Sequence, residues 1–248
     1  MYIMYRYIVK TRIRLKYVPR LTCMVVFYMI NFNDNDRKTR MIGRFRSLGL
    51  DLQFVTPVFE NDSRIENTAL YKRTSSIMLQ HLDSIRHFYE NTSADYCVVC
   101  EDDIYISKSL ATDLPNIIDT FSKLQLDVLL MGYLFPYSLH GNWHFPVLRD
   151  TTKYCYHGYP DDMWGSQMYM VSRKHAKYLL DTFTIQFAVE NLEKIHYNPD
   201  WTITKYGKRA AISPMMAVEE GDEKSGHEGQ SDFHKMCFIN NYRPDQYV

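Results

Sequence analysis

Runs of apolar residues alternate along this chain with segments whose apolar residues recur every three or four positions. A continuous apolar run is typical of a strand that is buried on both faces, and spacing of three and four is typical of an amphipathic helix. The sequence predicts strands over 24–30, 52–58, 96–100, 127–131 and 167–171. It predicts helices over a segment closed by Gly49 and over 75–90, 109–121 and 173–183, the last capped by Ser172.

This alternation with short connections predicts an α/β fold, with a mostly parallel, doubly wound, twisted sheet between helices. A last helix-and-strand unit is expected over 200–212, with its helix beginning close to Asp200. The aromatic-rich segment 132–159 is interpreted as a ligand-facing insertion. The acidic, glycine-containing segment 219–230 is expected to be a mobile loop.

Three consecutive carboxylates, Glu101-Asp102-Asp103, follow directly on the apolar segment 96–100. Ligands of open α/β sheets bind outside the carboxyl ends of the strands, and carboxylate oxygens there suit Mg²⁺ or Mn²⁺. The competing interpretation is a solvated turn, because Asp is common where strands end.

The bulk composition excludes some functions. The 29 basic and 29 acidic residues balance, so the protein has no overall positive electrostatic potential that would favour binding of nucleic acid. Residues 1–33 contain basic but no acidic side chains, and we interpret 1–22 as a basic arm with a weak membrane-surface contact as a lesser alternative. The uncharged stretch 21–33 is 13 residues long, short of the ~20 that span a bilayer.

The cysteines favour a reducing, cytoplasmic location. There are five of them, an odd number without the spacing of a disulfide scaffold. Cys97 and Cys100 resemble a C-x-x-C pair, but positions i and i+3 of a strand point to opposite faces. They are therefore predicted to be core residues and not zinc ligands.

Several separated motifs occur in one order along the chain. They are Ile30-Asn31 with Asp36-Arg37, Leu48-Gly49, Pro57-Val58, Leu79-Gln80-His81, Glu101-Asp102-Asp103, Gly165, Val171-Ser172-Arg173, Asp200-Trp201, Ser213-Pro214 and Ser231-Asp232. Over roughly residues 24–235 this order resembles glycosyltransferase family 25, which includes lipooligosaccharide sugar transferases and collagen galactosyltransferase domains. The resemblance implies a single GT-A-type domain over 23–248, an inverting mechanism, a nucleotide-sugar donor and Mn²⁺, with Mg²⁺ as the alternative.

In that frame Asp103 is the expected direct metal ligand, supported by Glu101. His227 and His234 are the candidates for a further ligand, late in the chain. Glu101 and Asp102 are also expected to contact the donor through bound water, ribose or sugar hydroxyls.

The donor nucleotide is expected against Asn31, Asp36, Arg37 and Gly165. Asn31 would bond the uracil edge, and Arg37 would pair with phosphate. The local alternative makes Asn33 or Asp34 a helix N-cap and places Arg37 on a solvated helix face.

An inverting transfer needs a general base for the acceptor hydroxyl. Asp200 and Asp162 are the candidates, with Asp161 as a third, and Asp200 is alternatively only an N-cap. The chain departs from the family at Gln80-His81, where Ser-His is usual, and in the insertion 132–159. These departures leave the identity of the acceptor substrate undetermined.

The sequence thus predicts a metal-dependent hexosyltransferase with a UDP-sugar donor, galactose before glucose, and a glycan or protein hydroxyl as acceptor. Two other classes stay open. A metal-dependent phosphoesterase would need a second cluster of His and Asp ligands, and the remaining histidines show no such spacing. A non-catalytic sugar-binding descendant is disfavoured by the intact acidic triplet. Oligomeric state is left open.

Overall fold

The structure is a computed structural model that describes residues 24–221 and 228–248. The predicted basic arm, 1–22, and the candidate ligand His227 lie outside the described residues. None of the helices in the described ranges has the length and apolar character needed to cross a membrane.

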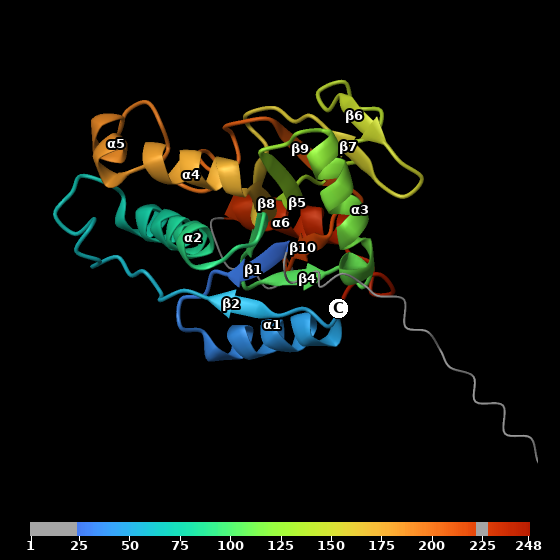
Figure 1. Ribbon diagram of the computed structural model, residues 1–248, viewed down its shortest axis with the longest axis horizontal. Coiled ribbons are helices and arrows are strands. Elements are labelled where there is room, and N and C mark those ends of the chain that lie inside the picture. The colour runs from blue at the N-terminus through green and yellow to red at the C-terminus, as the bar shows by residue number, and fades with distance from the viewer. Residues whose placement is uncertain (1–23, 222–227) are drawn as a thin grey trace, which may run out of the picture.

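One sheet of eight strands organises the described chain (Figure 1). In spatial order these strands are β2 (Leu52–Phe54), β1 (Val25–Met29), β3 (Tyr96–Cys100), β8 (Trp164–Ser172), β5 (Val128–Leu134), β9 (Arg209–Ser213), β7 (Cys155–His157) and β6 (Val147–Asp150). β8 is antiparallel to both neighbours, and β7 is antiparallel to β9 and β6, so the other six strands share one direction. The predicted α/β class with a mostly parallel sheet is confirmed.

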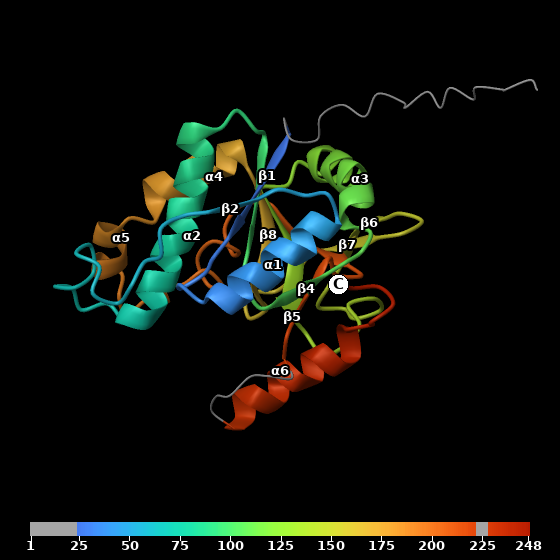
Figure 2. The same cartoon turned by 90° about the horizontal axis from the view of Figure 1, so that it is seen from below.

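Helices cover both faces of this sheet (Figure 2). They are α1 (Asn35–Ser47), α2 (Lys72–Asn91), α3 (Leu110–Lys123), α4 (Arg173–Thr182), α5 (Ile185–Glu190) and α6 (Glu228–Asn241). One apolar cluster joins one sheet face to α2 and α4, and a second joins the opposite face to α1 and α3. Cys97 belongs to the first cluster and Cys100 to the second, and both are fully buried. The prediction that these cysteines are core residues on opposite faces is confirmed.

The local signals at helix ends act as predicted. The Asp34 carboxylate accepts a hydrogen bond from the Arg37 amide and caps α1, and the Ser172 hydroxyl accepts one from the His175 amide and caps α4. Gly49 has a φ of +69°, the left-handed conformation that ends a helix at little cost for glycine.

Three predicted segments differ in the structure. The aromatic-rich segment 132–159 is not a separate insertion, because it contains the end of β5 and the sheet strands β6 and β7. No helix follows Asp200; residues 200–206 form turns before β9. The Asn198 side chain accepts a hydrogen bond from the Trp201 amide, and the Asp200 carboxylate accepts hydrogen bonds from β8 instead of capping a helix. The expectation of a mobile loop over 219–230 is also wrong at both ends, because Glu219 closes β10 (Ala217–Glu219) and α6 begins at Glu228.

A separate two-stranded ribbon explains why Glu219 does not lie in a loop. β4 (Ile104–Ile106) pairs antiparallel with β10, with Ile104 opposite Glu219. Each strand has three residues, too short for a period of two to be recognised in the sequence. The ribbon brings Glu219 beside the acidic triplet that follows β3.

Candidate functional site

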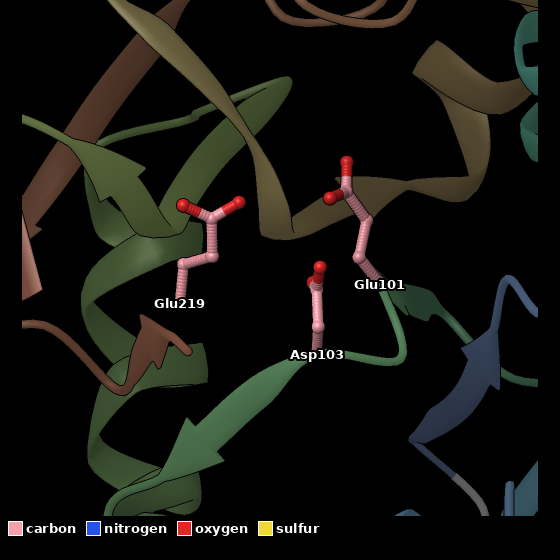
Figure 3. Close-up of side chains that lie close together, drawn as sticks. All are labelled: Glu101, Asp103 and Glu219. Atoms are coloured by element: carbon pink, nitrogen blue, oxygen red, sulfur yellow. The ribbon is translucent and has the colours of Figure 1, made fainter. Parts of the chain in front are cut away.

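Three carboxylates converge at the carboxyl end of β3. Glu101 and Asp103 come from the turn between β3 and β4, and Glu219 comes from the end of β10. One oxygen from each lies within 4.8 Å of the others. Figure 3 shows the three side chains extending toward one common space. Within the described part of the chain, no other group of three His, Cys, Asp or Glu side chains converges in this way.

The backbone fixes the positions of these carboxylates. β3 is buried along almost its whole length and ends at Cys100, after which the chain reverses into β4. The Glu220 amide donates a hydrogen bond of 2.7 Å to the Asp103 carbonyl, which joins β10 to the acidic turn. The cluster therefore stands on strand ends and not on a free loop.

The chemistry of this cluster fits a hard divalent cation. Carboxylates at such separations repel one another, and a cation between them offsets the repulsion. An all-carboxylate donor set suits Mg²⁺ or Mn²⁺, which prefer oxygen ligands. Glu219 is the ligand that the sequence did not indicate.

The predicted ligand His234 contacts Glu219 but is not one of the three converging side chains. It is on α6, and its Nδ1 is hydrogen-bonded to Oε2 of Glu219. A histidine that contacts a metal-ligating carboxylate orients that carboxylate. The structure therefore places His234 against a candidate ligand, outside the converging group itself.

Asp102, the middle acid of the triplet, is outside the converging group and contacts Asn31 and Arg37. It accepts hydrogen bonds from the Asn31 amide group at 2.7 Å and from Arg37 Nη1 at 3.1 Å. Arg37 Nη1 also lies 3.4 Å from Asp103. Burial raises the pKa of Asp102, the two hydrogen bonds oppose that rise, and the charge of Asp103 adds to it.

The loop after β1 is held firmly against this acidic turn. Asn31 is buried, donates a second hydrogen bond of 2.9 Å to the Asp34 carbonyl, and accepts one of 3.0 Å from Gln80 on its own carbonyl. The structure thus unites the predicted residues Asn31 and Arg37 with Asp102. Asp36 is exposed in the first turn of α1.

Glu220, next to the cluster, is neutralised by arginines of α1. Its carboxylate lies 2.5 Å from Arg44 and 2.9 Å from Arg40, and its side chain is only 5% exposed. The five acids at this edge therefore divide into two groups. Glu101, Asp103 and Glu219 converge, and Arg37 lies 3.4 Å from Asp103, whereas Asp102 and Glu220 lie outside this group and are paired with arginines of α1.

Asp200 is linked to this cluster by a short hydrogen-bonded path. Its Oδ1 accepts from the Gly165 and Ser166 amides at 2.8 and 2.9 Å, and the Ser166 hydroxyl donates to Glu101 at 2.7 Å. Asp162 is exposed in the turn before β8. Asp161 is also exposed and pairs with Arg209. Of the three candidate bases, Asp200 is the one joined to the carboxylate cluster by hydrogen bonds.

Gly165 lies where β8 packs most closely against β5. A Cβ at this position would lie 2.5 Å from Cδ1 of Leu130, a fully buried side chain. The structure thus gives Gly165 a packing role, and its amide helps to hold Asp200.

Gly165→Ala is accordingly expected to lower the free energy of unfolding by about 1–3 kcal/mol, because the added methyl must displace a core side chain. Urea unfolding followed by circular dichroism measures this. The matched control is Gly43→Ala on α1, where a Cβ meets nothing within 4 Å and the change is expected to stabilise by up to about 1 kcal/mol. Equal stabilities of the two variants would contradict the packing role.

No protein-family model and no curated protein sequence matches the chain. Three solved structures are similar to it at low identity. A glycosyltransferase involved in the glycosylation of the major capsid of PBCV-1 is 8% identical over 86% of this chain and 99% of its own, with a TM-score of 0.43. A197 from STIV is 13% identical over 79% and 85%, with a TM-score of 0.40. Mannose-1-phosphate geranyltransferase from Thermus thermophilus is 10% identical over 75% and 58%, with a TM-score of 0.37. These scores are too low to establish a shared fold, and the case for function rests on the residues of this chain.

Proposed function

We propose that this protein is a metal-dependent glycosyltransferase of the GT-A type, with a UDP-sugar as donor and the hydroxyl of a glycan or protein as acceptor. UDP-galactose is the favoured donor and UDP-glucose the alternative. The observation that carries the proposal is the convergence of Glu101, Asp103 and Glu219 at the carboxyl end of β3, beside the loop after β1. In open α/β sheets this edge is where nucleotides bind.

Asp103, Glu101 and Glu219 would hold Mn²⁺ or Mg²⁺, which supplies positive charge against the diphosphate of the leaving nucleotide. His234 would orient Glu219, and the Ser166 hydroxyl would orient Glu101. The role of these protein groups is to fix the ligands before the substrate arrives, so that little reorganisation is needed during the reaction.

Asn31 and Arg37 would form the nucleotide side of the site. Both already contact Asp102, and Arg37 also approaches Asp103, so the loop after β1 and the metal ligands are positioned together. Arg37 is partly exposed and keeps further guanidinium donors for a phosphate. The exposed carboxylate of Asp36, in the first turn of α1, adds an acceptor for ribose or sugar hydroxyls.

In an inverting transfer the acceptor oxygen attacks the anomeric carbon, the bond from that carbon to the diphosphate breaks, and a base takes the hydroxyl proton. We assign the base to Asp200, with Asp162 as the alternative. The hydrogen-bonded path from Asp200 through Ser166 to Glu101 supports this choice. The resemblance to glycosyltransferase family 25 belongs to this proposal and favours the inverting course.

The alternative of a two-metal phosphoesterase lacks its second ligand cluster in the part of the chain that the structure describes. A non-catalytic sugar-binding protein would keep the fold without turnover. Activity therefore separates the remaining classes.

The deciding experiment supplies the protein with UDP-galactose, UDP-glucose and other nucleotide sugars plus Mn²⁺, and follows nucleotide release with a mixture of glycan acceptors. Release of UDP from one sugar nucleotide, abolished by EDTA and restored by added Mn²⁺, is expected. Absence of release from every sugar nucleotide would refute the transferase. Release that persists in EDTA would refute the metal dependence.

A further inference from the structure

A pocket of about 350 Å³ is lined by Trp201, the residue that follows Asp200. Its walls include Trp201, Tyr206, His196, Asp161, Asp162 and Lys205. This volume is at the small end of the roughly 300–1,000 Å³ that is typical of ligand pockets. The nucleotide role proposed above for Asn31 and Arg37 does not use any of these residues.

Two separate paths connect this pocket with the carboxylate cluster. The first is the backbone step from Trp201 to Asp200, which is joined through Ser166 to Glu101. The second is a row of aromatic rings. Trp201 lies 6.2 Å from Trp164, and Trp164 lies 6.4 Å from Phe233, both measured between ring centroids. Phe233 precedes His234, which contacts Glu219. Chains of contacts therefore lead from the pocket to Glu101 and to Glu219.

Lys205 contacts the indole of Trp201 and fixes its orientation as one wall of the pocket. The ammonium group of Lys205 lies 5.2 Å from its ring centroid and 5.4 Å from that of Tyr159, and it donates to the Met163 carbonyl. Burial lowers the pKa of Lys205 to about 8, so the side chain is still mainly protonated at neutral pH. A partly exposed ring with fixed orientation is suited to contact the apolar face of a flat ligand.

The polar groups around this ring suit a neutral ligand with many hydroxyls. The carboxylates of Asp161 and Asp162 accept hydrogen bonds, and the ammonium groups of Lys194 and Lys205 donate them. The lining holds two acids and two lysines, and Asp161 is paired with Arg209, so the pocket has no large excess of positive charge for a phosphate. A pyranose ring has an apolar face and several hydroxyls, and it matches this combination.

From these observations we propose that the pocket beside Trp201 binds the acceptor of the transfer, and that this acceptor is a saccharide ring stacked on Trp201. The inference rests on the proposed transferase function and narrows its acceptor from any hydroxyl to a glycan. In this arrangement the acceptor hydroxyl is presented at Asp200, and the donor lies on the opposite side, toward Asn31.

The test measures saccharide binding by the full-length protein with Mn²⁺ and UDP present. Saturation-transfer NMR is recorded with methyl glycosides of galactose, glucose, mannose and N-acetylglucosamine. At least one glycoside is expected to bind, and Trp201→Ala is expected to weaken its binding about tenfold or more, because the stacking face is lost. His196→Ala alters an exposed residue of the same pocket and is expected to weaken binding while the fold is kept. Trp201→Phe, which keeps an aromatic face, is expected to bind between Trp201→Ala and the wild type.

Trp143→Ala is the matched control. Trp143 is 82% exposed in the aromatic-rich segment 132–159, the other candidate for the acceptor side, and its removal is expected to leave binding unchanged. The proposal is overturned if none of the glycosides binds the wild type, if Trp201→Ala and His196→Ala bind like the wild type, or if Trp143→Ala alone abolishes binding.

Donor turnover separates failure of this pocket from failure of the transferase. UDP release from the sugar nucleotide in the absence of any acceptor, by hydrolysis, is expected in the wild type and is expected to be unchanged in the control Trp143→Ala. Intact hydrolysis with unaltered saccharide binding would reject the pocket alone. Absence of any sugar-nucleotide turnover in the wild type would reject the proposed function itself.

Discussion

Asp103→Asn is expected to lower the rate of sugar transfer roughly a thousandfold while the fold is kept, because metal stabilisation of a leaving diphosphate is worth several kcal/mol. Asn keeps the shape of the side chain and one carbonyl oxygen but removes the negative charge that holds a cation. Transfer rates under saturating donor measure the effect. Glu219→Gln, at the ligand that comes from β10, is expected to behave in the same way.

Thermal unfolding gives a second readout for the same variants. Binding of Mn²⁺ is expected to stabilise the wild type by about 2.7 kcal/mol at a free concentration roughly 100 times its Kd, and to have little effect on Asp103→Asn or Glu219→Gln. Glu220→Gln is the matched control. This neighbour of Glu219 is tied to Arg40 and Arg44, so its substitution is expected to cost about 1–3 kcal/mol of stability while the response to Mn²⁺ remains. An active Asp103→Asn enzyme, or loss of the Mn²⁺ response in Glu220→Gln alone, would refute the ligand assignment.

Asp200→Asn is expected to reduce kcat by about 10²–10⁴-fold, which is the usual contribution of a general base. The substitution is well matched to the structure. Oδ1 of Asp200 accepts from the Gly165 and Ser166 amides, and the corresponding oxygen of asparagine can accept both hydrogen bonds. The local structure is therefore expected to survive while the proton acceptor is lost.

The same design distinguishes a base from a purely structural carboxylate. If Asp200 only anchors the start of β8, Asp200→Asn will keep nearly full activity. Asp162→Asn serves as the comparison: its KM for the acceptor is expected to rise, but its kcat at saturating acceptor is expected to stay within a few-fold of the wild type. A large loss in Asp162→Asn with an active Asp200→Asn would reverse the assignment.

The sequence predicted those parts of the fold that depend on local patterns. The apolar segment 96–100 became β3 with the same bounds, and Gly49 and Ser172 mark the expected helix ends. These features depend on the alternation of a few neighbouring residues and on the capping chemistry of single side chains. They do not require knowledge of which distant segments meet.

Glu219 was missed because its position depends on a distant pairing between two short strands, β4 and β10. A signal was nevertheless present. The segment 215–218 is apolar and is followed directly by Glu219 and Glu220, which repeats the pattern of 97–100 and the acidic triplet. The glycine and acids farther along made the whole segment resemble a loop. The prediction of a helix after Asp200 was wrong for a related reason. The carboxylate of Asp200 accepts hydrogen bonds from β8, a distant contact that no local pattern around Asp200 reveals.

Because β4 and β10 pair, the carboxylate cluster joins segments that are far apart along the chain. Glu101 and Asp103 belong to the middle of the chain, and Glu219 belongs to β10, which precedes α6. An ion bound among these three carboxylates would therefore cross-link the two segments. The hydrogen bond between His234 and Glu219 would extend that restraint to α6 itself. Metal depletion would then loosen the C-terminal segment before the central sheet, and the ion that prepares the site for its donor would also determine how firmly the end of the chain is held.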